Sequence, residues 1–348
     1  MVNNSTDWSV AAQFGEADSF ELLVVKTSIC MLVLSLSLIE NVIVLAVLRK
    51  NYRNRLRTAN SYFLANMSIA DALFALQNLP LAYNNFMLKA HWVLQGPVGM
   101  VLCKIDVFFS LISMVTINLT ILAIAVNRFF AVYIPMKRII TRRMCFLLIF
   151  LSWFIPTLFA SPMLYYAGLQ RENEKLTVCI VPNQHVIKIW YIVLTGILST
   201  TLMMMFVLYT AIGVKLWRRK FPFNVGQRAQ TQRERRNREI FKMLVTLILV
   251  FFVCSFPLYV LQMSHVLGFY TELKKRHGLF IAIVMMFMNG VINPIIYFTF
   301  NRGFRDGFKK AFCRFGCIRR TVYALNRRMT ASRRTWAPGI DRRTSTQL

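Results

Sequence analysis

Acidic residues and cysteines are both scarce in this sequence. Only 14 residues are Asp or Glu, against 42 Lys and Arg, so the formal net charge is +28. Seven cysteines in 348 residues are too few for a disulfide scaffold. The excess of positive charge alone is compatible with binding to nucleic acid or to an anionic membrane surface. The placement of the basic residues therefore has to decide between these two.

Signatures of enzymes and transporters are also missing. There is no His-Glu-x-x-His motif and no pair of catalytic acids, and the four histidines are scattered at or beyond the ends of the apolar segments. There is no internal repeat of the kind that many transporters carry, and the acids expected within the membrane are Glu40 and Asp71. Residues 1–22 lack an early basic and apolar stretch, so no cleavable signal peptide is expected. We therefore expect neither an enzyme nor a transporter or channel.

Apolar residues are abundant instead. They make up 56% of the chain, with 29 Phe and 18 Met, whereas a soluble domain has about 45–50%. They gather in segments long enough to cross a bilayer as helices, without the period-two alternation of a barrel. An all-α membrane protein with seven transmembrane helices is predicted, with spans at 23–48, 61–86, 100–134, 143–167, 187–217, 240–268 and 278–300.

The basic residues lie mainly on one side of these spans. Of the 42 Lys and Arg, 33 fall in the three inner loops and the tail. By the positive-inside rule this places residues 1–22 outside the cell, in a multi-pass protein of the cell membrane. The basic loops then hold the topology and touch anionic lipid, and no nucleic-acid partner is expected.

The third span carries the most informative pattern. It has Cys103 at its outer end and the triplet Asn127-Arg128-Phe129 at its inner end. A lone arginine late in a spanning helix is costly and usually functional. The segment resembles the third helix of rhodopsin-like (class A) G-protein-coupled receptors, which have this cysteine and an Asp-Arg-Tyr triplet at the same separation. This chain departs from the triplet at Asn127 and Phe129.

Further matches follow in the family's order, one set per span. Span six has Cys-Ser-Phe-Pro, where Ser255 replaces the family's tryptophan, and span seven has a full Asn-Pro-x-x-Tyr. The resemblance covers about residues 23–313. It implies a seven-helix bundle at 23–300, an amphipathic helix on the cytoplasmic membrane surface at 301–313, and a basic tail at 314–348 that its composition predicts to be disordered. The matching residues are Asn41, Asp71, Cys103, Arg128, Trp153, Cys179, Pro257, Asn293, Pro294, Tyr297 and Phe304.

The resemblance also assigns roles in activation and in the polar core. Because the family's aspartate helps to hold the arginine in the inactive state, Asn127 suggests raised basal activity. Asp71, Asn289 and Asn293 resemble the family's sodium cluster, but Ile117 and Gly290 stand where two usual ligands would be. Two alternatives remain: the site binds a sodium ion, or Asp71 holds water or a proton. The residues expected to act in G-protein coupling and activation are Asn127, Arg128, Phe129, Tyr209, Phe251, Ser255, Pro257, Asn293, Pro294 and Tyr297.

The ligand class follows partly from what the outer half lacks. Amine receptors carry an aspartate where this chain has Ser110, and retinal proteins carry a lysine where it has Phe287. The charged second outer loop and a short hairpin around Cys179 resemble peptide receptors. Cys103 and Cys179 are the only cysteines expected on the outer face, where disulfides persist, so a bond between them is predicted. A peptide ligand is favoured over a small molecule or lipid, and a non-signalling, scaffolding receptor is the alternative function. The pocket is expected to be lined by Ser110, Met114, Tyr259 and Gln262.

The termini carry short motifs for modification and partners. Asn3 and Asn4 lie in overlapping glycosylation sequons, and Cys313 and Cys317 follow the amphipathic helix as palmitoylation candidates. The chain ends in Leu348 after Ser-Thr-Gln, a pattern that suits a PDZ domain. Besides the G protein, arrestin and receptor kinases are the expected inner partners. No cofactor or other metal is expected apart from the sodium ion.

Overall fold

The computed structural model describes residues 18–51, 59–88, 91–134, 139–173, 176–218, 228–266, 272–300 and 302–312. Helices dominate these ranges, and a single antiparallel hairpin accounts for the strands among the described residues. The elements are α2 (Phe20–Asn51), α3 (Ala59–Met87), α4 (Gly96–Tyr133), α5 (Arg142–Ala160), α6 (Met163–Tyr166), β1 (Gly168–Asn173), β2 (Leu176–Ile180), α7 (Gln184–Arg218), α8 (Arg228–Val266), α9 (Glu272–Phe300) and α10 (Arg302–Phe312).

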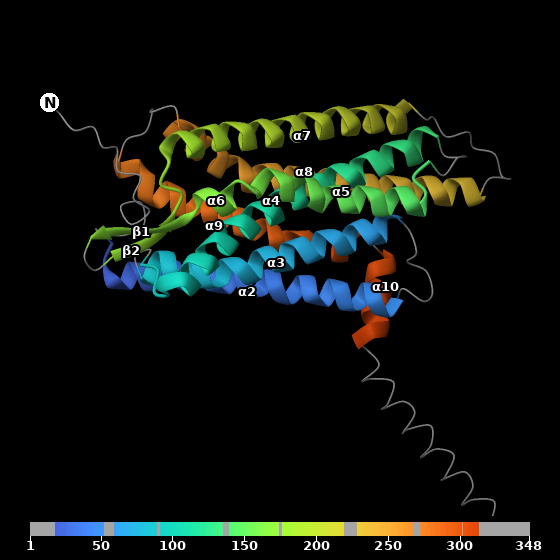
Figure 1. Cartoon of the computed structure of the whole chain (residues 1–348). Coiled ribbons are helices and arrows are strands. Elements are labelled where there is room, and N and C mark those ends of the chain that lie inside the picture. Colours follow the sequence, from blue (N-terminus) through green and yellow to red (C-terminus); the bar gives the residue numbers. More distant parts are fainter. Residues whose placement is uncertain are drawn as a thin grey trace, which may run out of the picture.

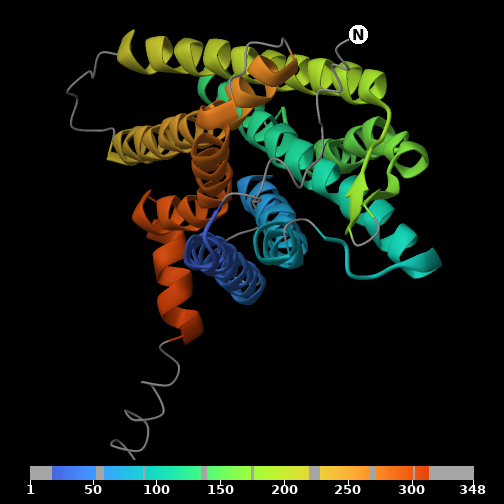
Figure 2. The same cartoon turned by 90° about the vertical axis from the view of Figure 1, so that its left-hand side faces the viewer.

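The long helices form one bundle with two distinct ends. The hairpin lies at one end and α10 crosses the other (Figure 1). Seen from the hairpin end, α2 and α3 stand nearly end-on and side by side, while α7 slants across the top (Figure 2). The two ends of the bundle therefore offer different surfaces, and the sequence-based orientation makes the hairpin end the outer one.

Six helical stretches among the described residues are long and apolar enough to cross a membrane: Phe20–Lys50, Gly96–Tyr133, Arg142–Tyr166, His185–Arg218, Phe241–Leu261 and Gly278–Phe300. Side chains on their outward faces are large and apolar, for example Leu32 and Phe206, which are 62% and 68% exposed. Helix α3 is absent from this group although it has 29 residues, because Asp71, Gln77 and several asparagines interrupt its apolar sequence. Several of these polar groups are buried in the bundle, where they find partners.

Two boundaries differ from the sequence-based expectation. The predicted span 143–167 is broken after Ala160, where Ser161 and Pro162 form a turn before the short α6, because the proline lacks the backbone N–H that would continue the helix. Helix α8 begins at Arg228, well inside the basic stretch that was expected to be a loop. Arg, Gln and Glu are good helix formers, so the spanning helix extends beyond its apolar part.

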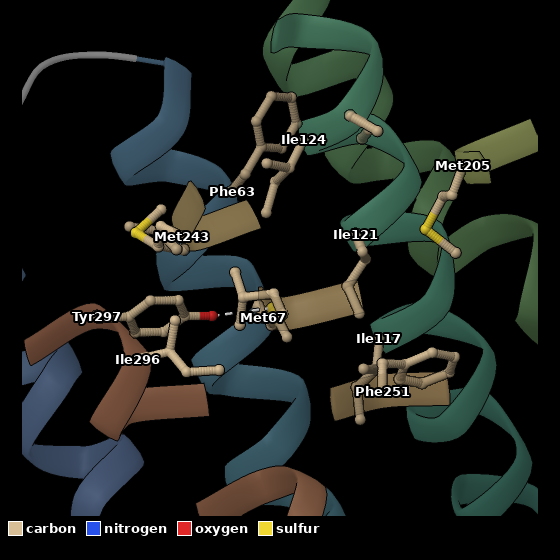
Figure 3. Packing of buried hydrophobic residues seen from close by; sticks show 14 of the residues in the cluster. Phe63, Met67, Ile117, Ile121, Ile124, Met205, Met243, Phe251, Ile296 and Tyr297 are labelled. Atoms are coloured by element: carbon tan, nitrogen blue, oxygen red, sulfur yellow. Dashed lines mark hydrogen bonds between the residues drawn. The ribbon is translucent and has the colours of Figure 1, made fainter. Parts of the chain in front are cut away.

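The main core lies toward the α10 end and joins side chains from α2, α3, α4, α7, α8 and α9 (Figure 3). Helix α10 attaches to it through Phe304, which is 1% exposed. The ring of Phe298 in α9 meets the rings of Phe304 and Phe308 edge-on, at centroid distances of 4.8 Å each. Such aromatic pairs contribute beyond their buried area, so α10 is anchored to the end of α9.

Candidate functional site

The outer end is organised around a disulfide bond. Cys103 in α4 is bonded to Cys179 in β2, with 5.6 Å between the two Cα atoms, which confirms the predicted pairing. The hairpin pairs Leu169 with Cys179. The segment before α4 also holds β2, because the backbone N–H of Trp92 donates to the Thr177 carbonyl oxygen at 2.7 Å. The hairpin is thus fixed to α4 by a covalent bond and to the first outer loop by its backbone.

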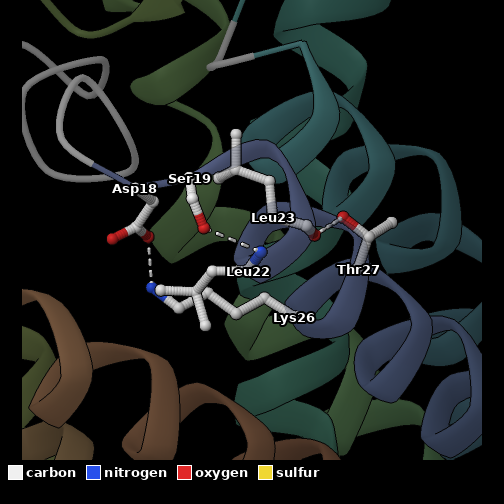
Figure 4. Close-up of polar contacts among 6 residues, drawn as sticks. All are labelled: Asp18, Ser19, Leu22, Leu23, Lys26 and Thr27. Atoms are coloured by element: carbon white, nitrogen blue, oxygen red, sulfur yellow. Dashed lines mark hydrogen bonds and ion pairs between the residues drawn. The ribbon is translucent and has the colours of Figure 1, made fainter.

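The first helix is fixed at the same end by a buried ion pair. Lys26 Nζ contacts Asp18 Oδ2, and both side chains are less than 10% exposed (Figure 4). The ammonium group also lies 5.5 Å from the ring centre of Phe280 in α9. Removing one partner of a buried pair leaves an uncompensated charge. The pair therefore holds residue 18 close to the point where α2 and α9 meet.

The predicted pocket residues are brought together only in part. Ser110 and Met114 are half-buried on α4, and Tyr259 of α8 is buried. Tyr259 packs with Val115 of α4 and with Leu194 and Leu198 of α7. Gln262 lies one turn further along α8. Tyr259 is therefore at the junction of three helices, below the outer part of the bundle.

The hydroxyl of Tyr259 lies beside two polar side chains, those of Asn118 in α4 and Ser255 in α8. Asn118 Nδ2 donates to the Met114 carbonyl oxygen at 3.2 Å. Asn118 Oδ1 is buried and has no well-formed hydrogen bond. The place of the family's tryptophan is thus taken by a small polar cluster next to the kink residue Pro257.

The central polar residues are directly connected. Asn293 of α9 donates through Nδ2 to Asp71 Oδ2 at 3.2 Å, and both residues are buried. Oδ1 of Asn293 and Oδ1 of Asn289 are buried without a protein partner, while Ile117 packs in the apolar core. A carboxylate and two unpaired amide oxygens are acceptors that suit a hard cation, although such ions prefer more oxygen ligands than these.

A close approach between α2 and α9 lies beside this centre. Asn41 Nδ2 donates to the carbonyl oxygens of Ser37, at 2.9 Å, and Gly290, at 3.0 Å. A Cβ at residue 290 would collide with the Ser37 hydroxyl. The glycine that removes a usual sodium ligand therefore lets the two helices pack together.

Asn66 was not among the residues singled out from the sequence, although it begins an Asn-Met-Ser sequon inside the predicted span 61–86. Its Nδ2 donates to Thr120 Oγ1 at 2.8 Å and to Ser152 Oγ at 3.2 Å. Its Oδ1 accepts from Trp153 Nε1 at 2.7 Å. Asn66 thus joins α3 to α4 and α5. The one signal in the sequence was an amide side chain inside the predicted span 61–86, where a polar group needs a partner.

The inner triplet is held by a neutral contact. Asn127 Nδ2 donates to Asn60 Oδ1 of α3 at 2.6 Å. Tyr209 of α7 is buried, lies close enough to Arg128 for an electrostatic interaction, and packs against Phe241 with ring centres 6.3 Å apart. At the inner end, the arginine of α4 therefore lies next to α7.

Two further contacts complete the inner end. The ring of Phe129 stacks on Tyr133 at a centroid distance of 4.4 Å, and the Tyr133 hydroxyl donates to the Ala211 carbonyl oxygen of α7 at 3.1 Å. Tyr297 of the Asn-Pro-x-x-Tyr motif is fully buried and donates to Met67 Sδ at 3.1 Å (Figure 3). Phe251 is buried in the same cluster, and Pro257 and Pro294 lie inside α8 and α9. The predicted modification sites Asn3, Asn4, Cys313 and Cys317 fall outside the described residues.

Comparison with known proteins gives one consistent result. The family model of the 7 transmembrane receptor (rhodopsin family) matches residues 40–297. The chain is 30% identical to the Tachykinin-like peptides receptor 99D of Drosophila melanogaster over 276 residues, which are 74% of this chain and 51% of the fly protein. It is 26% identical to the Substance-P receptor of Mus musculus over 318 residues, 89% of this chain and 75% of the mouse protein. The chain spans about half the length of the fly receptor. It belongs to the rhodopsin family of seven-transmembrane receptors, and is a receptor rather than an enzyme.

Proposed function

We propose that this receptor binds an extracellular peptide and activates a heterotrimeric G protein, with its amino terminus outside the cell. The observation that carries the proposal is the hairpin β1–β2, which the Cys103–Cys179 bond fixes over the outer end of α4. A strand with a free edge pairs readily with an extended peptide, and its side chains select among sequences. Two similar receptors are named for tachykinin-like peptides and for substance P, which supports the same ligand class.

The inner end supports coupling to a G protein. Arg128 and Tyr209 approach one another there, and the surrounding loops are strongly basic. Such basic loops also favour a cytoplasmic position for this end and an extracellular position for the hairpin. Arrestin and receptor kinases are proposed as further inner partners on the same resemblance.

A peptide screen tests this function. Cells expressing the receptor would be exposed to substance P, tachykinin-like peptides and a broader peptide library, and read with G-protein dissociation sensors. We expect at least one peptide to give a saturable response that disappears in the double variant Cys103→Ser, Cys179→Ser. If no peptide gives a response but a lipid or small molecule does, the peptide ligand class is rejected and the assignment as a signalling receptor stands.

The second candidate is a receptor that binds its ligand without signalling. It is favoured by Asn127 and Ser255, which replace two residues that the family uses in activation. Saturable peptide binding to purified receptor, without any nucleotide exchange on added G proteins, would select this alternative. Ligand-free exchange above that of mock membranes would instead agree with raised basal activity.

Three peripheral features complete the proposal, all of them outside the described residues. Asn3 and Asn4 are proposed glycosylation sites, to be tested by glycosidase digestion. Cys313 and Cys317 are proposed palmitoylation sites, to be tested by acyl exchange on the double Cys→Ser variant. The end at Leu348 is proposed to bind a PDZ protein, and a pulldown that Leu348→Ala does not weaken would reject it.

A further inference from the structure

Asp106, an acidic residue to which the proposed function gives no role, lies near the outer end of α4. Asp106 is one turn below Cys103 and is half-buried. Among the described residues it forms no ion pair, since the salt bridge found there joins Lys26 to Asp18. Its carboxyl group is hydrogen-bonded by the side chain of Gln77, which is neutral and does not balance the charge. An ionisable residue within a spanning helix that lacks an oppositely charged partner is a candidate functional group.

Gln77 of α3 adds a hydrogen-bond acceptor to the surroundings of Asp106. Its Nε2 donates to the backbone carbonyl oxygen of Asp106 at 2.7 Å, which fixes the amide. Its Oε1 is buried and accepts no hydrogen bond from the part of the chain that the structure describes. A carboxylate and an amide oxygen only accept hydrogen bonds. The group that would satisfy both is a donor with positive charge, either an ammonium or a guanidinium.

The position of Asp106 connects it to the candidate pocket. Residues four apart lie on one face of a helix, so Asp106, Ser110 and Met114 form a line down α4. All three are half-buried, whereas Ile105 and Phe109 on the neighbouring face are 41% and 43% exposed. Asp106 therefore extends the pocket-lining face toward the hairpin.

Within the ranges that the structure describes, no basic side chain forms an ion pair with Asp106. Lys104 is two residues away on the same helix, and residues at that spacing do not face one another. Lys26 is already occupied by Asp18. The charge of Asp106 is thus available to a cation that enters from the outer side.

We propose that Asp106 and Gln77 form an anionic subsite that receives a positively charged group of the ligand, such as an amino terminus or a Lys or Arg side chain. The proposal deepens the proposed function and rests on it for the identity of the ligand as a peptide. The family's amine receptors place their acid at the position of Ser110, one turn deeper. Asp106 lies one turn nearer the hairpin and was not among the pocket residues predicted from the sequence.

A test without any ligand uses two small probes of opposite charge. Ser110→Cys places a thiol one turn below Asp106. In intact cells, its rates of reaction with the cationic methanethiosulfonate MTSET and the anionic MTSES are measured, each divided by the rate with a free thiol in solution. At about 6 Å, one unit charge changes each rate roughly threefold even in water-like surroundings. We therefore expect the cation-to-anion ratio to fall about tenfold when Asp106→Asn is added.

Two controls separate charge from structure. Asp106→Glu keeps the charge and should keep the ratio, while Glu21→Gln removes an exposed outer acid and should leave it unchanged. Gln77 donates to the backbone carbonyl oxygen of residue 106 and also hydrogen-bonds the Asp106 side chain. The side-chain oxygen of asparagine is an acceptor as well, so Asp106→Asn keeps acceptors for both contacts. A ratio that does not change in Asp106→Asn would overturn the subsite. A thiol that neither reagent reaches would also overturn it, because no ligand cation would reach Asp106 either.

The result is independent of the peptide screen. If no peptide causes nucleotide exchange but the ratio falls, the proposed function fails and the subsite stands. If peptides activate the receptor, those with a cationic group should lose about tenfold in potency in Asp106→Asn, and neutral analogues of the same peptides should lose nothing.

Discussion

The side-chain amide of Asn127 donates a hydrogen bond to Oδ1 of Asn60, with 2.6 Å between nitrogen and oxygen. This contact joins α4 to α3 directly beside Arg128. It is neutral on both sides, whereas the family resemblance implies a carboxylate at residue 127. Charge-assisted hydrogen bonds are about twice as strong as neutral ones, so the inner end of α4 has lost an electrostatic restraint on the arginine.

Asn127→Asp is therefore expected to lower ligand-free activity. A gain of about 1.4 kcal/mol for the inactive state shifts a two-state equilibrium about tenfold. Basal nucleotide exchange would be measured in membranes with matched receptor levels. Asn84→Asp makes the same change at the outer end of α3 and should have no effect. Equal exchange in wild type and Asn127→Asp, both well above mock membranes, would show that residue 127 does not set the balance.

Asp71 and the unpaired oxygens of Asn289 and Asn293 are expected to bind sodium weakly. Since a ligand of the folded state stabilises it by mass action, sodium chloride should raise the melting temperature of the purified receptor by about 2 °C over choline chloride. Asp71→Asn should abolish the difference between the two salts. A wild-type receptor that melts at the same temperature in both would indicate that water occupies the site.

The hydrogen bonds of Asn66 are expected to contribute to stability. Asn66→Leu leaves Trp153 Nε1 without its acceptor and removes the donor to Thr120. The expected loss is about 1–3 kcal/mol, toward the lower end because such bonds are modest in membrane bundles. Thermal melting in detergent would measure it. Thr246→Val, which removes a half-buried hydroxyl that bonds only to the Lys242 carbonyl oxygen of its own helix, should change little. A comparable loss in both variants would argue against the junction.

The disulfide is expected to stabilise the outer end. Replacing Cys103 and Cys179 by Ser should cost about 2–4 kcal/mol, because the chain between them is no longer closed. Surface labelling of intact cells and melting of the purified receptor would both report the change. Cys254→Ala removes a free cysteine from α8 and serves as the control. Unchanged melting after loss of both cysteines would mean that the hairpin is held by its other contacts.

The sequence predicted those features that depend on local pattern or on spacing along the chain. Long apolar segments predicted the helices, and the order of motifs identified the family and the pairing of Cys103 with Cys179. The second span was predicted as one of these apolar segments, although Asp71 and its asparagines keep α3 out of the described helices that are apolar enough to cross a membrane. The start of α8 at Arg228 was missed because basic composition resembles a loop even where the residues favour a helix.

Contacts between polar residues of different helices were not predictable in the same way. Asn66 faces Ser152 and Trp153 only because α3, α4 and α5 pack in one particular rotation. Lys26 was assigned to the membrane boundary, and nothing in the pattern indicated its ion pair with Asp18. Asp106 lies inside the predicted span 100–134. Only the folded arrangement of α3 and α4 shows that it is half-buried beside Gln77 and has no ion-pair partner among the described residues.

Tyr259 is expected to couple α4 to α8 through its hydroxyl. That hydroxyl lies beside Asn118 and Ser255, next to the kink at Pro257. Tyr259→Phe keeps the ring packed against Val115 and Leu198 and removes only this polar contact. Melting temperatures of Tyr259→Phe, Asn118→Ala and the double variant form a cycle, and residues in contact couple by about 0.5–3 kcal/mol. We expect a coupling near 1 kcal/mol, whereas Tyr83→Phe on the exposed face of α3 should be additive with Asn118→Ala. Additive losses for Tyr259 as well would show that the ring, and not the hydroxyl, links the two helices.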